Sequence, residues 1–298
     1  MINYLLLLLS TLMSTGKAIF CKAIGTEGES KKEKALLNFK AFAVAFLSAL
    51  LVTIKDIGRL FLVSDFSFIL SIFFGLSIAL TQIFQSKALG QGPSSTVTLI
   101  YACGFLIPIF YGFFFWDESV SVFQWLGIAL LLFSLTLCLL KKEKHRKLSS
   151  WIPFAVLAML GSGTSAIFQK THQYSEFSSE ISFYLVFCLF FSSLFTLIIY
   201  LTTGSEQNCK KEVTDKKRVL LKTFIIPVCL GICVGLLNFL NLILSGNLPS
   251  VILFPIYNVG SMLLFILISA IIYKDKMTAL QKIGFALGII AILIIGLL

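Results

Sequence analysis

Residues 90–104 read GQGPSSTVTLIYACG, and residues 246–260 read GNLPSVILFPIYNVG. The two stretches share Gly, Pro, Ser, Ile, Tyr and Gly at identical spacing, with an offset of 156 residues. In each, a glycine and a proline interrupt an apolar sequence, and Pro93 and Pro249 suit the first turn of the helix that follows. Such matched interruptions predict a chain built from two similar halves.

The repeat extends to both sides of these stretches. With an offset of 148 residues, five positions of one half match five of the other: Ser14, Ala18, Ile19, Phe20 and Lys22 match Ser162, Ala166, Ile167, Phe168 and Lys170. With an offset of 157 residues, Gln124, Gly127, Ala129 and Leu130 match Gln281, Gly284, Ala286 and Leu287, and Glu118 corresponds to Asp275. We therefore divide the chain into residues 1–140 and 141–298.

The composition indicates a membrane protein. Of the 298 residues, 58% are hydrophobic and 13% are charged, and the mean hydropathy is +0.97. Soluble domains carry about a quarter charged residues, so the surplus apolar surface requires lipid. The net charge of +10 does not indicate a nucleic-acid partner, because the Lys and Arg residues lie in short loops and form no continuous basic face.

Ten segments are long and apolar enough to cross a bilayer, which takes about 20 residues per helix. They are approximately 2–24, 34–54, 67–89, 93–116, 120–140, 151–171, 179–202, 222–245, 249–273 and 278–297. The predicted fold is an all-α membrane protein with ten transmembrane helices. Because each half holds five spans, an odd number, the second half is inverted relative to the first.

Two stretches that end the halves resemble a known family. Residues 116–130 read WDESVSVFQWLGIAL and residues 273–287 read YKDKMTALQKIGFAL, each an acidic residue followed by a segment with Gln and Gly. With the two five-span halves, they resemble the EamA type of the drug/metabolite transporter superfamily. The resemblance covers essentially the whole chain and implies a central cavity lined chiefly by spans 1, 3, 4, 6, 8 and 9. Members carry amino acids, nucleotide sugars, cationic drugs and other metabolites.

Acidic residues lie only in predicted loops and at predicted helix ends, so no carboxylate is expected at the centre of a span. This disfavours the exchange of hydrophobic cations for protons, which usually needs a buried carboxylate. Lys17 is the intramembrane charge, at roughly 10 Å depth. It is expected to face the cavity and attract a carboxylate or phosphate, or to be a packing cation satisfied by helix-end carbonyls. Lys22 and Lys170 lie at the boundary and are interpreted as interfacial anchors.

Amides and tyrosines complete the predicted substrate site. Gln82 and Gln85 on the third span correspond to Asn238 and Asn241 on the eighth, and a spacing of three residues puts each pair on one helix face. They are expected either to bind a polar substrate or to link helices, at about 1 kcal/mol per hydrogen bond. The remaining candidates lie about 12 Å deep, near the midplane: Tyr101, Tyr257 and Asn258.

These features favour a secondary transporter that moves a small polar metabolite, such as an amino acid or another carboxylate, across the plasma membrane by alternating access. The alternatives are a non-transporting receptor or assembly subunit, a channel, and an enzyme, for which no catalytic motif is present. No cofactor, metal or nucleic acid is expected. The expected partners are the lipid bilayer and the metabolite. A coupling ion and a homodimer through the small-residue motif Gly284-x-x-x-Gly288 remain open.

The orientation is directly testable. Of the 24 Lys and Arg residues, 20 lie in or beside the loops after spans 1, 3, 5, 7 and 9. The positive-inside rule puts these loops in the cytoplasm and both termini outside, whereas many EamA-type proteins keep both termini in the cytoplasm. By the charge rule, a C-terminal reporter enzyme that works only outside the cell will be active. Activity of a cytoplasm-specific reporter at the same position would contradict it.

Overall fold

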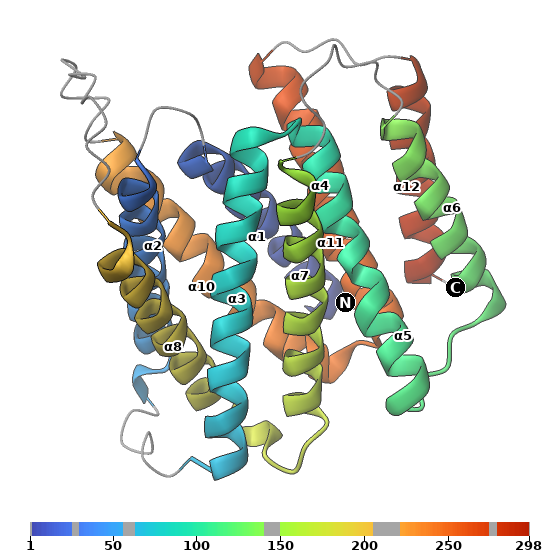
Figure 1. The fold of residues 1–298 in the computed structure, drawn as a ribbon. Coiled ribbons are helices and arrows are strands. Elements are labelled where there is room, and N and C mark those ends of the chain that lie inside the picture. Colours follow the sequence, from blue (N-terminus) through green and yellow to red (C-terminus); the bar gives the residue numbers. More distant parts are fainter. Residues whose placement is uncertain are drawn as a thin grey trace.

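The chain folds into helices that are stacked side by side in a computed structural model (Figure 1). The structure describes residues 2–25, 30–55, 63–139, 150–204, 221–273 and 279–297, and within them every regular element is helical. The α-helices are α1 (Ile2–Gly25), α2 (Lys31–Val52), α3 (Asp65–Gln91), α4 (Ser94–Ala102), α5 (Leu106–Phe115), α6 (Val122–Leu139), α7 (Ile152–Gln173), α8 (Ile181–Thr202), α10 (Ile226–Asn247), α11 (Ser250–Tyr273) and α12 (Ala279–Leu297).

These helices lie within a few residues of the predicted spans. The fourth span consists of α4, a 3₁₀ turn (Cys103–Phe105) and α5, which together form one apolar rod from Ser94 to Phe115. Within the described residues, eight helices are long and apolar enough to cross a membrane. Two shorter apolar stretches are Val122–Leu137 in α6 and Lys282–Leu297 in α12. The chain is therefore a multi-pass membrane protein.

Local sequence signals explain where the helices begin and end. Ser30 caps α2 in a capping box, in which its side chain accepts from the Glu33 N–H and the Glu33 side chain accepts from the Ser30 N–H. Ser64 accepts from the Ser67 N–H and begins α3. Gly92 ends α3, and Pro93 precedes α4, so the last two residues of the GQGP sequence form a tight turn between the two spans.

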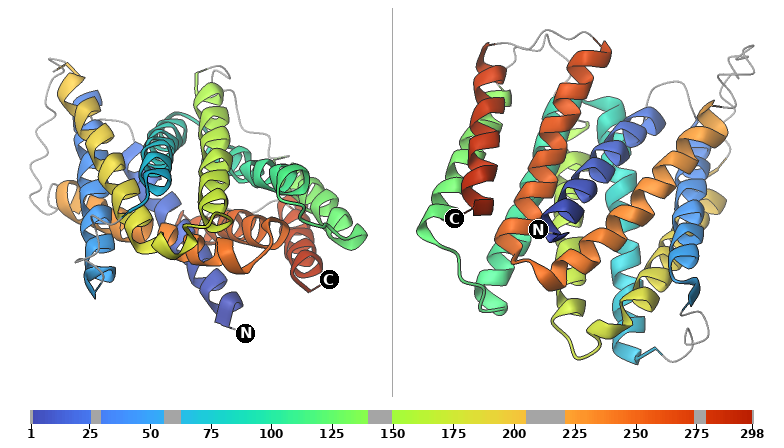
Figure 2. Two further views of the ribbon diagram at one scale, coloured as in Figure 1. Left: turned by 90° about the horizontal axis from the view of Figure 1, so that it is seen from below. Right: turned by 180° about the vertical axis from the view of Figure 1, so that it is seen from behind.

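Helices distant in the sequence pack against one another (Figures 1 and 2). Helix α1 packs against α10 and α11, and α7 packs against α3 and α4. Helix α2 contacts α8 and α10, whereas α6 packs mainly against α12 at one edge of the molecule. Successive spans alternate in direction, so that α3 begins at the bottom of Figure 1 and α10 begins at the top.

The outer surface is apolar, as a lipid-facing surface must be. Leu51, Phe115 and Val122 are 70%, 69% and 74% exposed, and many other Leu, Ile and Phe side chains point outward. Conversely, the interior holds numerous buried polar side chains, among them Lys17, Gln82 and Lys170. An apolar outer surface around an interior that holds polar side chains as well as an apolar core suits a bilayer.

One helix contact is closer than side chains allow. The ends of α1 and α3 meet at Gly25 and Gly90, where a Cβ atom on Gly90 would lie 1.7 Å from the Gly25 carbonyl oxygen. A Cβ atom on Gly25 would likewise lie 2.0 Å from the Ser86 carbonyl oxygen. Because both obstacles are backbone atoms, the contact requires glycine on both helices.

Gly90→Ala is therefore expected to destabilise the protein by about 1–3 kcal/mol, the usual cost of overpacking. The measurement is thermal unfolding of the purified protein in detergent. Gly204→Ala is the matched control, because nothing lies within 4 Å of a Cβ atom there. Equal melting temperatures for the two variants would contradict the close contact.

Candidate functional site

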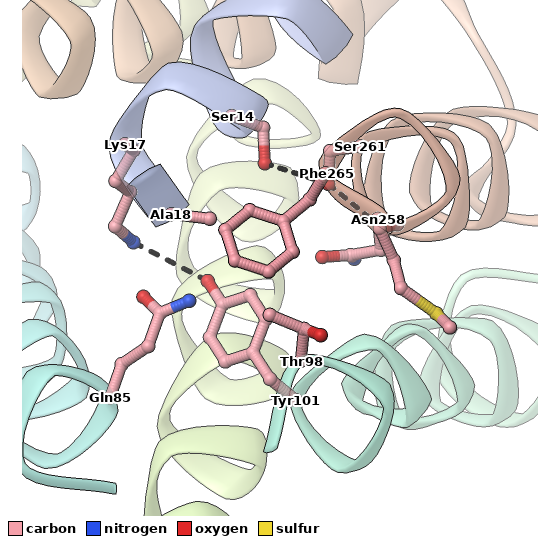
Figure 3. A pocket seen from close by; sticks show the side chains of 10 residues that line it. Ser14, Lys17, Ala18, Gln85, Thr98, Tyr101, Asn258, Ser261 and Phe265 are labelled. Carbon is pink, nitrogen blue, oxygen red and sulfur yellow. Dashed lines mark hydrogen bonds between the residues drawn. The ribbon is translucent and has the colours of Figure 1, made fainter. Parts of the chain in front are cut away.

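A small polar cavity lies between α1, α3, α4 and α11 (Figure 3). Its lining residues are Ser14, Lys17, Ala18, Gln85, Thr98, Tyr101, Asn258, Ser261, Met262 and Phe265. The empty space amounts to about 290 Å³ when its crevices and open side are included. Its interior has room for about one water molecule, so the cavity is nearly closed in this conformation.

Lys17 supplies the charge of this cavity. It comes from α1, is 6% exposed, and its Nζ donates to the Tyr101 Oη at 3.3 Å. The ammonium also lies 5.5 Å from the centre of the Tyr101 ring. None of the ten lining residues is acidic. The cavity therefore presents a buried positive charge held by a neutral phenol.

Two amide oxygens at this cavity lack hydrogen bonds. Within the described residues, the Gln85 Oε1 and the Asn258 Oδ1 have no partner, although the two residues are only 1% and 2% exposed. The nearby Ser14 hydroxyl is satisfied, because it donates to the Ser261 Oγ at 3.1 Å. Figure 3 shows the Gln85 amide beside the Tyr101 hydroxyl and the Asn258 amide beside the Phe265 ring. Unpartnered buried acceptors are costly, so the site is suited to a ligand that donates hydrogen bonds.

Three other predicted amides link helices and do not line the cavity. The Gln82 Nε2 donates to the Asn38 Oδ1 on α2 at 3.2 Å. The Asn238 Oδ1 on α10 accepts from the Gln169 Nε2 on α7 at 3.1 Å, and the Asn241 Oδ1 accepts from the Ser10 hydroxyl on α1. These hydrogen bonds match the helix-linking alternative, although the Gln82 Oε1, like the Gln85 Oε1, has no partner within the described residues.

Tyr257 is buried beside the cavity and does not line it. Its ring packs edge-on against Phe254, with centroids 6.1 Å apart, and it is 6% exposed. The eight predicted site residues are thus divided equally. Lys17, Gln85, Tyr101 and Asn258 meet at the cavity, whereas Gln82, Asn238, Asn241 and Tyr257 are not among its lining residues.

A second polar cluster was not predicted from the sequence. The Lys170 Nζ lies 2.6 Å from the Glu118 Oε1, and the two side chains are 0% and 7% exposed. Lys170 also donates to the Leu248 carbonyl oxygen at 2.7 Å, and the Ser250 N–H donates to the Glu118 Oε2 at 2.9 Å. The interpretation of Lys170 as an interfacial anchor is therefore wrong, because a buried carboxylate holds its ammonium inside the protein.

Two aromatic residues cover this ion pair. The Tyr174 hydroxyl donates to the Glu118 Oε1 at 3.0 Å, and the Trp116 ring stacks on the Tyr174 ring at 5.6 Å. We call Trp116, Glu118, Lys170 and Tyr174 the Glu118 cluster. Burial raises the pKa of the Glu118 carboxyl, but the Lys170 charge and the Ser250 hydrogen bonds outweigh burial and hold the pKa below its usual range. Burial and the Glu118 charge raise the pKa of Tyr174 to about 12.

The sequence offered only a partial signal for this cluster. The repeat analysis singled out Glu118 and Lys170 separately, each with a counterpart in the other half. No spacing rule pairs a loop residue with a helical residue 52 positions away. Their proximity follows from the packing of the α5 end, the α7 end and the start of α11.

Comparison with known proteins identifies the fold alone. No protein-family model matches the chain, and no curated protein matches it in sequence. Chains of solved structures do share its architecture. One, described only as "Crystal structure of protein", superposes with a TM-score of 0.71 at 15% sequence identity, over 99% of this chain and 97% of the other.

The Glu118 ion pair predicts a specific pH dependence of stability. Since the native pKa of Glu118 lies below its usual value of 4.5, its contribution is complete above about pH 4.5 and is lost as the pH falls through the native pKa. Glu118→Gln is expected to cost about 1–3 kcal/mol at pH 7 and to weaken the acid dependence. Melting temperatures between pH 7 and pH 3 measure both effects.

Asp117→Asn provides the matched control. Asp117 is the exposed neighbouring acid, with a φ of 50° that asparagine tolerates. It should behave like the unchanged protein. If the melting temperature of Glu118→Gln fell with pH as that of this control does, the ion pair would make no contribution to the pH dependence of stability.

Proposed function

We propose that this chain is a secondary transporter that carries a small polar metabolite with a carboxylate across the plasma membrane by alternating access. We propose further that it is an EamA-type member of the drug/metabolite transporter superfamily. The observation that carries the proposal is the buried Lys17 ammonium at a cavity with no acidic lining residue. The similar solved structure supports the fold only. The substrate is therefore inferred from the residues of the site.

The electrostatics of the cavity favour an anionic group. A buried ammonium loses several kcal/mol of hydration, and the Tyr101 hydroxyl at 3.3 Å offsets only part of this loss. A bound carboxylate would add a full opposite charge in a medium of low dielectric constant. Lys17 is therefore the residue that recruits the substrate, and Tyr101 orients its ammonium.

The neutral amides favour a substrate that also donates hydrogen bonds. The unpartnered oxygens of Gln85 and Asn258 lie at the same cavity as Lys17. An α-amino acid provides the required pair of groups, a carboxylate for Lys17 and an ammonium for the amide oxygens. Because the cavity is nearly closed, the substrate enters only when the helices around it move apart.

Helix packing supports two inverted halves. The first helix of each predicted half packs against the third and fourth spans of the other: α1 contacts α10 and α11, and α7 contacts α3 and α4. The fifth spans, α6 and α12, pack against each other. The corresponding helices run in opposite directions in Figure 1. Such reciprocal packing suits rocking of one half against the other around a midplane site.

A receptor or an assembly subunit is the second candidate, because a fold does not fix a function. Such a protein would bind the same ligand through Lys17 and transport none of it. Ligand binding measured by thermal shift, followed by flux into liposomes, distinguishes the two.

For a transported amino acid, Lys17→Met is expected to reduce flux into liposomes by at least about tenfold, because one charge-assisted contact contributes roughly 1.5–3 kcal/mol. The substitution keeps the apolar stem and removes the ammonium. Lys87→Met is the control, since Lys87 is exposed and its ammonium packs on the Phe154 ring, 3.8 Å from the ring centre. L-amino acids that raise the melting temperature of the protein are selected first. The measurement is the uptake of each of these, in labelled form, into the liposomes.

The ligand pair alanine and propionate tests the amide oxygens separately. Alanine is expected to bind more tightly than propionate, which lacks the ammonium group. Unchanged flux in Lys17→Met would exclude anion recruitment by Lys17, and binding without flux in the unchanged protein would favour the receptor.

A further inference from the structure

The Glu118 cluster joins the two predicted halves of the chain at one face. Trp116 and Glu118 belong to the half made of residues 1–140, whereas Lys170 and Tyr174 belong to residues 141–298. The backbone groups that hold the ion pair, the Leu248 C=O and the Ser250 N–H, also belong to the second half. Every one of these polar contacts to Glu118 therefore crosses between the halves.

The cluster lies where α5 and α7 end and α11 begins. Along α11, Ser250, whose N–H donates to Glu118, precedes Asn258 at the cavity by eight residues, or about 12 Å. Phe254 and Tyr257 occupy the intervening helix, and both side chains are buried.

We infer that the Glu118–Lys170 ion pair is the latch of a gate, which holds this face closed and must break before the cavity opens there. The inference rests on the proposed function, because only alternating access requires the halves to separate at one face. Glu118 and Lys170 act as positioning residues in this role, since neither lines the cavity.

An ion pair has physical properties that suit a latch. While it is buried, each charge depends on the other, because an unpaired charge in a low-dielectric interior is strongly unfavourable. When the halves part, both charges enter water together, so hydration offsets much of the lost attraction. A purely apolar seal of the same size would instead expose its surface to water with no such compensation.

The surrounding contacts make the closed state cooperative. Lys170 contacts Glu118, the Leu248 carbonyl and the Tyr174 ring, whose centre lies 5.4 Å from its ammonium. Tyr174 in turn bonds Glu118 and stacks on Trp116. Loss of one contact weakens the others, which is the behaviour expected of an element with two discrete arrangements.

The test measures access to the cavity from each face. Thr98→Cys places a thiol on the cavity wall, and a membrane-impermeant methanethiosulfonate reagent is applied to vesicles of either orientation. Labelling is read at position 98 by peptide mass spectrometry, which separates it from the native cysteines. Adding Glu118→Gln is expected to speed labelling from the Glu118 face about threefold to tenfold, as for one weakened charge-assisted hydrogen bond, with no increase from the opposite face.

Asp117→Asn is again the control, since it removes the adjacent, exposed charge. The variant Glu118→Gln with Lys170→Met leaves no unpaired buried charge and keeps the test decisive if the single variant folds poorly. It should show the same one-sided increase. Labelling equal to that of the control, or equally faster from both faces, would overturn the latch.

Amino-acid flux is measured in the same vesicles. Absence of flux in the unchanged protein would count against the proposed transport function. Unaltered labelling in a protein that does transport would count against the latch alone.

Discussion

Every backbone N–H and C=O group within a bilayer needs a partner from the chain itself, because the hydrocarbon core contains no water. Helices meet this demand locally, and the long described segments of this chain adopt them. The same constraint makes each buried polar side chain expensive. The most informative residues about function are therefore the buried polar ones: Lys17, Lys170 and the buried amides. The outward Leu and Phe side chains, in contrast, are explained by contact with lipid.

The two polar centres differ in how fully their groups are partnered. At the Glu118 cluster, both charges and the Tyr174 hydroxyl have partners at 2.6–3.0 Å. At the cavity, Lys17 has only a neutral phenol as a hydrogen-bond partner among the lining residues, and the amide oxygens of Gln85 and Asn258 have none. Bonded charges hold structure together, while buried acceptors without a partner have bonds left for a ligand. Beside the cluster, the Ser250 Oγ is also unpartnered within the described residues, but both charges are paired. This difference supports the proposal that the cavity binds the substrate and that the cluster joins the predicted halves.

The close approach of backbones positions these centres. Gly25 and Gly90 bring α1 against α3, and Lys17 and Gln85, one on each of these helices, line the same cavity. Gly104 lies against the backbone of α7, where a Cβ atom would be 2.8 Å from the Met159 carbonyl oxygen. Because the helices are already in backbone contact at these points, a shift of one helix must displace its neighbours. Such displacements couple separate sites on different helices.

The sequence by itself determined the membrane class, the helix positions to within a few residues and four of the cavity residues, because apolar length and rare intramembrane polar groups are strong local signals. Only the tertiary structure separated Gln82 from Gln85. Three residues along a helix differ by about 60° in direction, enough to turn one amide toward Asn38 and leave the other at the cavity. It alone paired Glu118 with Lys170, because the meeting of a loop side chain with one on α7 depends on how the helices pack, which no sequence spacing encodes.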